Sequence, residues 1–500
     1  MVSMQERVTN HLRDSQEKRP PCPQQDFYLG MQNVSTTNAS EDCLHLNIWA
    51  PPLSCGSWLL TQDECRMRPV LFFLYGAAFQ NGANSFEART RLYDGQYLSA
   101  LGDLVVVVPN YRVGALGFLS GPSAGVLPGN AGLYDQRLAL SWTLDNIGNF
   151  GGNASRLVLA GHDAGASSLG YHLFHGDAAL FTRNVARYIL QSGGPFNRYK
   201  DDGVEGARLL ATNLQCGNDL SAPTALRCLQ NSHVDSVARS PLASRFVPLL
   251  NRTPVARRQP RRGGSDSADK RKATGPQGKQ FLLGRVVREG VYPWFVEHKR
   301  TGSSEPLHLA TRLIGRNALE AWQTATGITL RPFDGDTLYQ QATSKPGDAF
   351  ALVTQSESRL SQRTFARSCQ EVCPMSELAE QLQAWENRVY VYALGYRPRY
   401  SSWPDLTEAV RFEDMHLVFG MPFRPDVPSS ELDKQWSRTM IHVWSTFAHT
   451  GKVPAMNGTR WPVYDPLEPS FMKLGVDGVN MERDSKRARC DFLRGSRNPY

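Results

Sequence analysis

Five short runs of apolar residues constrain the fold of this chain more than any other feature. Each run is continuously apolar over three to six residues, rather than alternating between apolar and polar positions. A strand needs this pattern when both faces of its sheet are covered, as in the parallel sheets of α/β proteins. The runs are VLFFLY, LVVVVP, LVLA, YIL and VYVYAL, at residues 70–75, 104–109, 157–160, 188–190 and 389–394.

Helical patterns separate the predicted strands. Between residues 133 and 147, for example, Leu133, Leu140, Leu144 and Ile147 fall on one face of a helix. Alternating strands and helices predict a layered α/β domain that binds ligands at the carboxyl ends of its strands. No internal repeat or linker divides the chain, and no apolar run is long enough to cross a membrane. We therefore expect residues 1–500 to form one domain without a membrane span.

The third apolar run leads into the segment LVLAGHDAGASSLG, residues 157–170. Its glycines and small residues predict a strand, a sharp turn and a helix, a pattern that resembles the nucleophile elbow of α/β hydrolases. In those enzymes a serine occupies the tip of the elbow, whereas this chain has Asp163. Three interpretations are open: a hydrolase that lost its nucleophile, an enzyme that uses an aspartate, or a chance spacing of glycines.

The positive charge of the chain is concentrated in one segment. The net charge is +8, and residues 252–279 contain nine Lys or Arg residues and two Asp residues. Because this segment is rich in Gly, Pro and Ser and poor in apolar residues, we expect a disordered, solvated insertion. A polyanion-binding arm and a protease-sensitive loop are the alternatives. The rest of the chain is nearly neutral, so we do not expect it to bind nucleic acid.

Cysteines and glycosylation sequons both indicate an oxidising, extracellular compartment. The chain has nine cysteines, several of them closely spaced, and no C-x2-C pair or histidine cluster that would indicate zinc. We therefore expect disulfides, no metal and no cofactor. The start of the chain does not resemble a signal peptide. Five N-x-[ST] sequons lie at Asn33, Asn38, Asn153, Asn251 and Asn457.

Several longer segments resemble the type-B carboxylesterase and cholinesterase family, which has the α/β-hydrolase fold. They include SEDCLHLNIWAP, NYRVGALGFLS, LQSGGP, LVFGMPF and WSTFAHTGKVP, and they follow the order of the family between about residues 20 and 490. The resemblance implies a mostly parallel central sheet flanked by helices. Since the first strands of the family have no counterpart, we expect these N-terminal strands to be missing.

The resemblance also implies three disulfides, Cys22–Cys43, Cys216–Cys228 and Cys373–Cys490. Spacing alone suggests a fourth between Cys55 and Cys65, which leaves Cys369 unpaired. The loop from Cys22 to Cys43 contains no Trp. Choline-binding members of the family use a Trp in that loop for a cation–π contact, so the resemblance does not favour a choline ester as substrate.

Active members of the family use a serine nucleophile, an acidic residue and a histidine base, in that chain order. The resemblance places Asp163 at the serine and Arg411, the first residue of RFEDMHLVFG, at the histidine. For the acid it points to Glu320, which follows Gly315 by five residues as in the GxxxDEG turn of the family. We therefore expect Asp163, Arg411 and Glu320 to form a buried ion cluster in place of a catalytic relay.

The oxyanion hole of the family corresponds to Gly76, Ala77, Ala78 and Ala164 in this chain. Positions 77 and 78 carry alanines where glycines are common in the family. Backbone N–H donors need no particular side chain. We therefore expect the hole to survive if neither alanine is forced to a positive φ.

These replacements predict a protein that does not hydrolyse esters. An arginine cannot accept a proton at neutral pH, and an aspartate that attacked an ester would form a mixed anhydride. The resemblance to non-catalytic members, such as neuroligins, neurotactin, glutactin and the C-terminal module of thyroglobulin, implies an extracellular module for binding, adhesion or scaffolding. The alternatives are a weak carboxylic ester hydrolase and an epoxide-hydrolase-like enzyme. In the latter, Asp163 would attack and a distant histidine, His162 or His416, would activate water.

Residues 428–451, PSSELDKQWSRTMIHVWSTFAHTG, predict an amphipathic helix near the end of the chain. Family members dimerise through near-terminal helices, so this helix is a candidate surface for a homodimer. An ordinary core helix is the alternative. We expect an extracellular protein partner, a second copy of the chain, or both.

Overall fold

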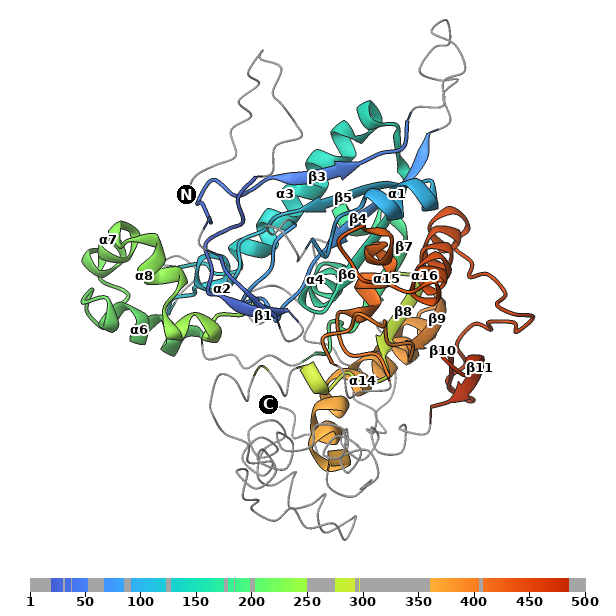
Figure 1. Ribbon diagram of the computed structural model, residues 1–500. Coiled ribbons are helices and arrows are strands. Elements are labelled where there is room, and N and C mark those ends of the chain that lie inside the picture. Colours follow the sequence, from blue (N-terminus) through green and yellow to red (C-terminus); the bar gives the residue numbers. More distant parts are fainter. Residues whose placement is uncertain are drawn as a thin grey trace, which may run out of the picture.

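The computed structural model describes most of the chain between residues 19 and 484. Nine strands form one sheet, in the order β11-β10-β9-β8-β7-β6-β4-β5-β3 (Figure 1). Neighbouring strands are parallel from β10 to β5, whereas the pairs β10·β11 and β3·β5 at the two edges are antiparallel. The described residues are 19–29, 32–36, 38–52, 67–84, 91–122, 127–174, 179–183, 185–197, 203–249, 275–292, 296, 360–403 and 408–484.

The predicted parallel sheet is confirmed, because the five apolar runs lie in β4, β5, β6, β7 and β9. Two further parallel strands, β8 and β10, were not predicted, and in β8 Gly284 and Arg285 interrupt the apolar run. The strands of the sheet are β3 (Leu46–Trp49), β4 (Arg68–Leu74), β5 (Val105–Pro109), β6 (Gly152–His162), β7 (Val185–Gln191), β8 (Gln280–Val286), β9 (Arg388–Leu394), β10 (Ser470–Gly475) and β11 (Gly478–Arg483).

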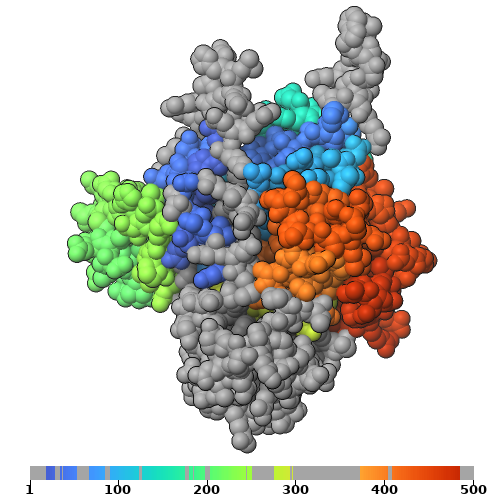
Figure 2. Space-filling model, in the orientation of Figure 1, coloured from blue at the N-terminus to red at the C-terminus, as the bar shows by residue number. Residues whose placement is uncertain are grey.

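Helices cover both faces of the sheet, which explains why β4 and β5 are buried along their whole length. One face packs against α1, α15 and α16, and the other against α3, α4 and α14. A separate lobe of α6, α7 and α8 lies at one side, in green in Figures 1 and 2, beside the N-terminal segment in blue. The helices are α1 (Gln96–Gly102), α2 (Gly114–Phe118), α3 (Ala131–Asn146), α4 (Ala164–Leu173), α5 (Ala179–Thr182), α6 (Gly203–Asn213), α7 (Pro223–Asn231), α8 (Val234–Ala238), α14 (Leu360–Ala384), α15 (Glu413–Val418) and α16 (Glu431–Thr450).

The helix predicted at residues 428–451 is α16, and it is a core helix. Its start is fixed by a capping box, in which Ser430 and Asp433 each accept a hydrogen bond from the backbone N–H of the other. Most of its apolar side chains, including Trp444 and Phe447, are buried against the sheet, whereas Leu432 is exposed. The outward face is mostly polar, so a dimer through this helix would have to use residues such as Arg438.

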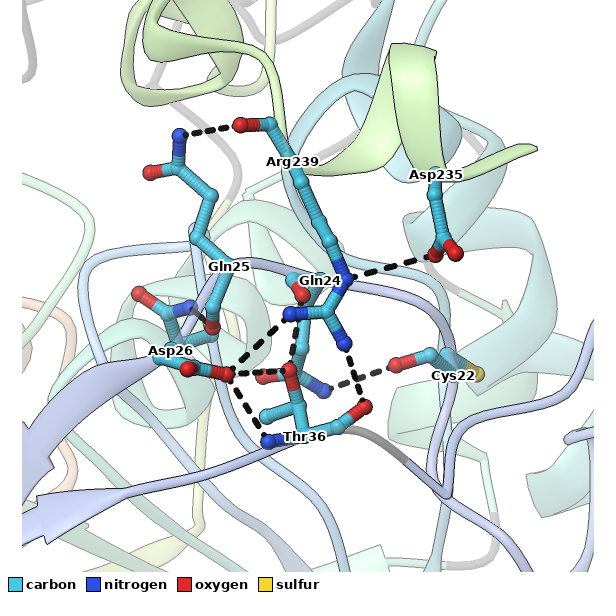
Figure 3. A network of polar contacts seen from close by, with 8 residues as sticks. Cys22, Gln24, Gln25, Asp26, Thr36, Asp235 and Arg239 are labelled. Carbon is cyan, nitrogen blue, oxygen red and sulfur yellow. Dashed lines mark hydrogen bonds and ion pairs between the residues drawn. The ribbon is translucent and has the colours of Figure 1, made fainter. Parts of the chain in front are cut away.

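A polar network joins the N-terminal segment to the lobe of α6, α7 and α8 (Figure 3). Arg239, which follows α8, lies 3.2 Å from Asp26 and 3.3 Å from Asp235, and it donates to Thr36 O at 2.7 Å. Gln25 donates to Arg239 O in return at 3.2 Å. This network holds the short hairpin of β1 (Phe27–Leu29) and β2 (Gln32–Val34) against the lobe.

The disulfides Cys22–Cys43 and Cys216–Cys228 form as predicted. Cys373 is also disulfide-bonded, whereas its predicted partner Cys490 lies outside the described residues. The same holds for Cys55, Cys65 and the side chain of Cys369.

Two sequons, Asn38 and Asn457, are exposed, and Asn153 is half-buried. Asn33 lies in β2, but its side chain is outside the described part of the chain, as is Asn251. Most of the basic insertion, residues 252–274, also lies outside it. Its last five residues are placed, and Lys279 Nζ donates to Thr182 O at 2.8 Å. The predicted boundary of the insertion at 279 was therefore too late.

No helix in the described part of the chain has the length and apolar character needed to cross a membrane. Within the same residues, no group of three or more His, Cys, Asp or Glu side chains is arranged to hold a metal ion.

Candidate functional site

The predicted strand–turn–helix around Asp163 is present. β6 ends at His162, α4 begins at Ala164, and Asp163 alone connects them with φ 53° and ψ −118°. A positive φ costs a non-glycine residue roughly 1–3 kcal/mol. This strained turn is the backbone geometry that lifts the tip residue of an elbow above the sheet.

Glycines on both sides of Asp163 are required by close packing. A Cβ atom on Gly165 would lie 1.9 Å from Leu74 O, and one on Gly161 would lie 2.6 Å from the carbonyl carbon of Gly165. Both distances are far shorter than real Cβ contacts. The glycine spacing in GHDAG is therefore a steric requirement of the elbow, and chance spacing is excluded as its explanation.

The Asp163 carboxylate is buried, with only 4% of the residue exposed. Arg411 Nη1 lies 3.0 Å from Asp163 Oδ1. The backbone N–H of Ala78 donates to Asp163 Oδ2 at 2.6 Å. Both carboxylate oxygens are thus held, one by a cation and the other by a backbone donor. The predicted contact between Asp163 and Arg411 is present.

Arg411 is equally buried and lies between two carboxylates. Its position is fixed by the preceding residue, Val410, which forms a bridge with Arg288 beyond the end of β8. Besides contacting Asp163, the guanidinium donates to Ser192 O and places Nε 3.2 Å from Glu289 Oε2. Glu289 Oε1 accepts hydrogen bonds from Ser192 Oγ at 2.6 Å and from Val286 N–H at 2.9 Å.

Glu289 was not selected from the sequence, and it is the second carboxylate beside Arg411. Glu320, which we expected at this place, lies outside the described residues. The signal that identifies Glu289 is the segment GRVVREG, residues 284–290. Here the acid follows Gly284 by five residues and is itself followed by a glycine, as in GxxxDEG. The segment around Glu320 has the first spacing but lacks the following glycine.

The turn that corresponds to the oxyanion hole follows β4. Ala78 has φ 55° and Phe79 has φ 66°, whereas Ala77 is not at a positive φ. The condition that neither alanine is forced to a positive φ is therefore not met at Ala78. The Ala78 N–H still points to the tip of the elbow, but the Asp163 carboxylate already accepts its hydrogen bond. Gly76 packs against the elbow so closely that a Cβ atom would lie 2.5 Å from Asp163 Cβ.

Comparison with known proteins agrees with this architecture. The family model described as "Carboxylesterase family" matches residues 5–493. The chain belongs to the carboxylesterase family. Among similar proteins, acetylcholinesterase of Bungarus fasciatus is 29% identical over 96% of this chain and 77% of its own length. Cholinesterase of Mus musculus is 28% identical over 92% and 73%, and acetylcholinesterase of Danio rerio is 28% identical over 96% and 79%.

This carboxylesterase-family chain has a second buried polar pair beneath the elbow. His162 Nε2 lies 3.9 Å from Asp414 Oδ1, and both side chains are fully buried. Among the described residues, the ring nitrogens of His162 and the carboxylate oxygens of Asp414 have no hydrogen-bond partner. Burial lowers the pKa of His162 well below its usual value, and Arg411 adds to this effect. Burial and the nearby Glu289 raise the pKa of Asp414 to about 8.

Neither histidine considered as a base has its ring among the described partners of the Asp163 carboxylate. The His162 ring lies 3.9 Å from Asp414, and its nitrogens make no hydrogen bond within the part of the chain that the structure describes. His416 lies in α15 with its ring 5.9 Å from that of Tyr400. Burial and Arg424 lower the pKa of His416 to about 4. Within the described residues, the partners of the Asp163 side chain are thus a guanidinium and a backbone amide.

Proposed function

We propose that this chain is a non-catalytic member of the carboxylesterase family that serves as an extracellular binding, adhesion or scaffold module. One observation carries the proposal: Asp163 is tied at the same time to Arg411 and to the Ala78 N–H. The residue at the nucleophile position therefore contacts both the residue at the base position and one donor of the oxyanion hole.

Each step of ester hydrolysis lacks its reagent in this arrangement. A serine hydrolase needs a nucleophile whose proton passes to a base. Asp163 has no such proton to give, and Arg411 cannot accept one at neutral pH. An acyl group on Asp163 would be a mixed anhydride, and the Ala78 N–H would have to leave the carboxylate before it could bind an oxyanion.

Two features support an extracellular location. The disulfides Cys22–Cys43 and Cys216–Cys228 need an oxidising compartment. Two sequons, Asn38 and Asn457, present exposed side chains to a glycosyltransferase. A protein in this location with an occupied elbow retains the family surface for contacts with other molecules, since a fold can serve recognition without serving catalysis.

Turnover of p-nitrophenyl acetate and of styrene oxide tests the proposal. We expect no turnover above background by the unmodified protein, Asp163→Ser or Arg411→His. We expect measurable ester hydrolysis by the double variant Asp163→Ser with Arg411→His, because the introduced imidazole would lie beside Glu289. Adding Glu289→Gln to the double variant should lower that turnover, because the orienting carboxylate is lost.

Turnover of either substrate by the unmodified protein that disappears in Asp163→Ala would contradict the proposal. Ester hydrolysis would then indicate a weak esterase, and epoxide hydrolysis an enzyme with an aspartate nucleophile. A matched control is Asp219→Ala, which removes an exposed carboxylate far along the chain from the elbow.

A further inference from the structure

Basic residues gather at the edge of the sheet opposite the elbow. The elbow lies at the carboxyl end of β6, and the amino ends of the parallel strands lie at the other edge. We call the following set the basic edge: Arg156 in β6, Arg183 and Arg187 at the start of β7, Lys279 before β8, Arg388 at the start of β9 and Lys452 after α16.

Strand pairing places two residues of the basic edge, Arg187 and Arg388, in one row. Arg187, Gln280 and Arg388 are register partners on three adjacent strands. Adjacent strands are about 4.8 Å apart, so Arg187 and Arg388 are separated by about 10 Å on the same face of the sheet. Lys279 O accepts a hydrogen bond from Arg388 N–H at 2.9 Å. Lys279 Nζ reaches Thr182 O, the residue before Arg183.

Arg156 and Lys452 lie near Arg187 at the carboxyl end of α16. Arg187 Nη1 donates to Ala448 O at 2.8 Å, and Arg156 Nη2 donates to His449 Nδ1 at 3.4 Å. Gly451 approaches so closely that a Cβ atom on it would lie 3.1 Å from Arg187 Nε. Lys452 follows directly. Arg156, Arg187, Arg388 and Lys452 thus lie around the carboxyl end of α16, whereas Lys279 and Arg183 lie at the same end of the strands beside α5.

No described carboxylate forms an ion pair with any residue of the basic edge. Arg68 at the start of β4, by contrast, lies 2.5 Å from Asp103 Oδ1. Burial lowers the pKa of Arg187, and the neighbouring charge of Arg156 lowers it further. Arg183, Arg388 and Lys452 are exposed, and the other three are half-buried. The basic edge therefore presents clustered positive charge at one end of the strands, and no described carboxylate pairs with it.

We propose that the basic edge binds a linear sulfated polysaccharide. The partner class rests on the extracellular location in the proposed function, where such chains are the abundant linear polyanions. A linear polyanion suits cations arranged in a row across strands. Single-stranded nucleic acid would need exposed aromatic rings for stacking, and Tyr188 and Tyr390 at these strand starts are buried.

Binding to heparin, measured at several NaCl concentrations with the whole chain, tests this proposal. The edge variant replaces the three exposed residues by serine: Arg183→Ser, Arg388→Ser and Lys452→Ser. The matched control removes the same charge elsewhere: Arg208→Ser, Arg227→Ser and Arg438→Ser. By the counterion-release argument for linear polyanions, the edge variant should lower the slope of log affinity against log salt by about 2 to 3. The control should leave it unchanged.

A third variant, Arg257→Ser with Arg258→Ser and Arg261→Ser, removes three charges from the basic insertion. Equal binding by the edge variant and its control would overturn the proposal, as would a loss of binding confined to the insertion variant. Competition by a DNA duplex that equals or exceeds heparin at the same charge concentration would overturn the assignment to a polysaccharide. Because none of these measurements involves ester hydrolysis, they can fail without affecting the proposed loss of catalysis.

Discussion

Two arginine clusters in this molecule contain the same kinds of partner but differ in their exposure to solvent. Arg239 contacts two carboxylates, Asp26 and Asp235, and a backbone carbonyl, and its side chain is 30% exposed (Figure 3). Arg411 likewise contacts two carboxylates, Asp163 and Glu289, and a backbone carbonyl, but its side chain is only 4% exposed.

This difference in exposure changes what each cluster contributes. Near the surface, water screens the charges and can replace a lost partner, so an ion pair contributes little. In the interior, charges are costly to bury and depend on one another, so the loss of one partner leaves an uncompensated charge. The exposed cluster fastens the N-terminal segment to α8, whereas the buried cluster determines whether the elbow can hold its conformation.

The largest expected effect is a difference in stability loss between substitutions of Arg411 and Arg239. Arg411→Met should reduce the free energy of unfolding by about 3–5 kcal/mol, because two buried carboxylates lose their cation. Arg239→Met should reduce it by about 1 kcal/mol or less. Urea denaturation of both variants beside the unmodified protein measures the difference.

If Arg411→Met does not fold, Arg411→Lys keeps the comparison open. A lysine retains the charge but loses the forked geometry, so we expect an intermediate loss of stability. Equal losses in Arg239→Met and Arg411→Met would show that burial does not distinguish the two clusters.

The buried pair of His162 and Asp414, next to the buried cluster, predicts a pH dependence opposite in sign to that of the exposed cluster. A pKa of about 8 for Asp414 in the folded protein lies above the value of about 3.9 in an unfolded chain. The folded state therefore binds a proton at Asp414 that the unfolded chain has lost, so stability falls as the pH rises from about 4 to about 8 and levels off above that. Asp26 has the opposite sign: burial opposes ionisation, but hydrogen bonds from Thr36 and Arg239 outweigh it and lower its pKa.

We expect Asp414→Asn to flatten the loss of stability between pH 6.5 and 8.5. His162 adds a small gain of stability of opposite sign near pH 6.5, because its lowered pKa leaves it neutral when folded whereas an unfolded histidine is about half protonated there; both proteins share this gain. Glu413, whose pKa burial raises to about 7, contributes mainly below that value. Urea denaturation at both pH values measures the change, with Glu413→Gln as control. The same pH slope in Asp414→Asn and the unmodified protein would contradict the raised pKa.

The sequence was sufficient to predict the features that depend on local pattern. Continuous apolar runs predicted β4, β5, β6, β7 and β9, and the small residues around Asp163 predicted the elbow. The contact of Asp163 with Arg411 was predicted because the resemblance supplied the register over 247 intervening positions. No local pattern carries that information.

Two features of the structure, Glu289 and the Arg239 network, were not predicted from the sequence, each for a physical reason. Glu289 was missed because a glycine-to-acid spacing recurs by chance, and only the following glycine separates residues 284–290 from the segment around Glu320. The Arg239 network was missed because Asp26 and Arg239 meet only in the folded chain. Its residue types are common on any surface, so nothing marks them before folding.

The smallest expected effect on stability concerns the turn after β4, which contains Ala77 and Ala78 and lies beside the elbow. Ala78 has φ 55°, a conformation that costs alanine about 1 kcal/mol relative to glycine. Ala78→Gly should therefore raise the free energy of unfolding by roughly 0.5–1 kcal/mol, after the greater chain entropy of unfolded glycine is subtracted. Ala77→Gly is the matched control, because Ala77 is not at a positive φ, and it should lower stability by a similar amount. Urea denaturation of the two variants measures the difference in sign. A lower stability in Ala78→Gly than in Ala77→Gly would show that the turn at Ala78 is not strained.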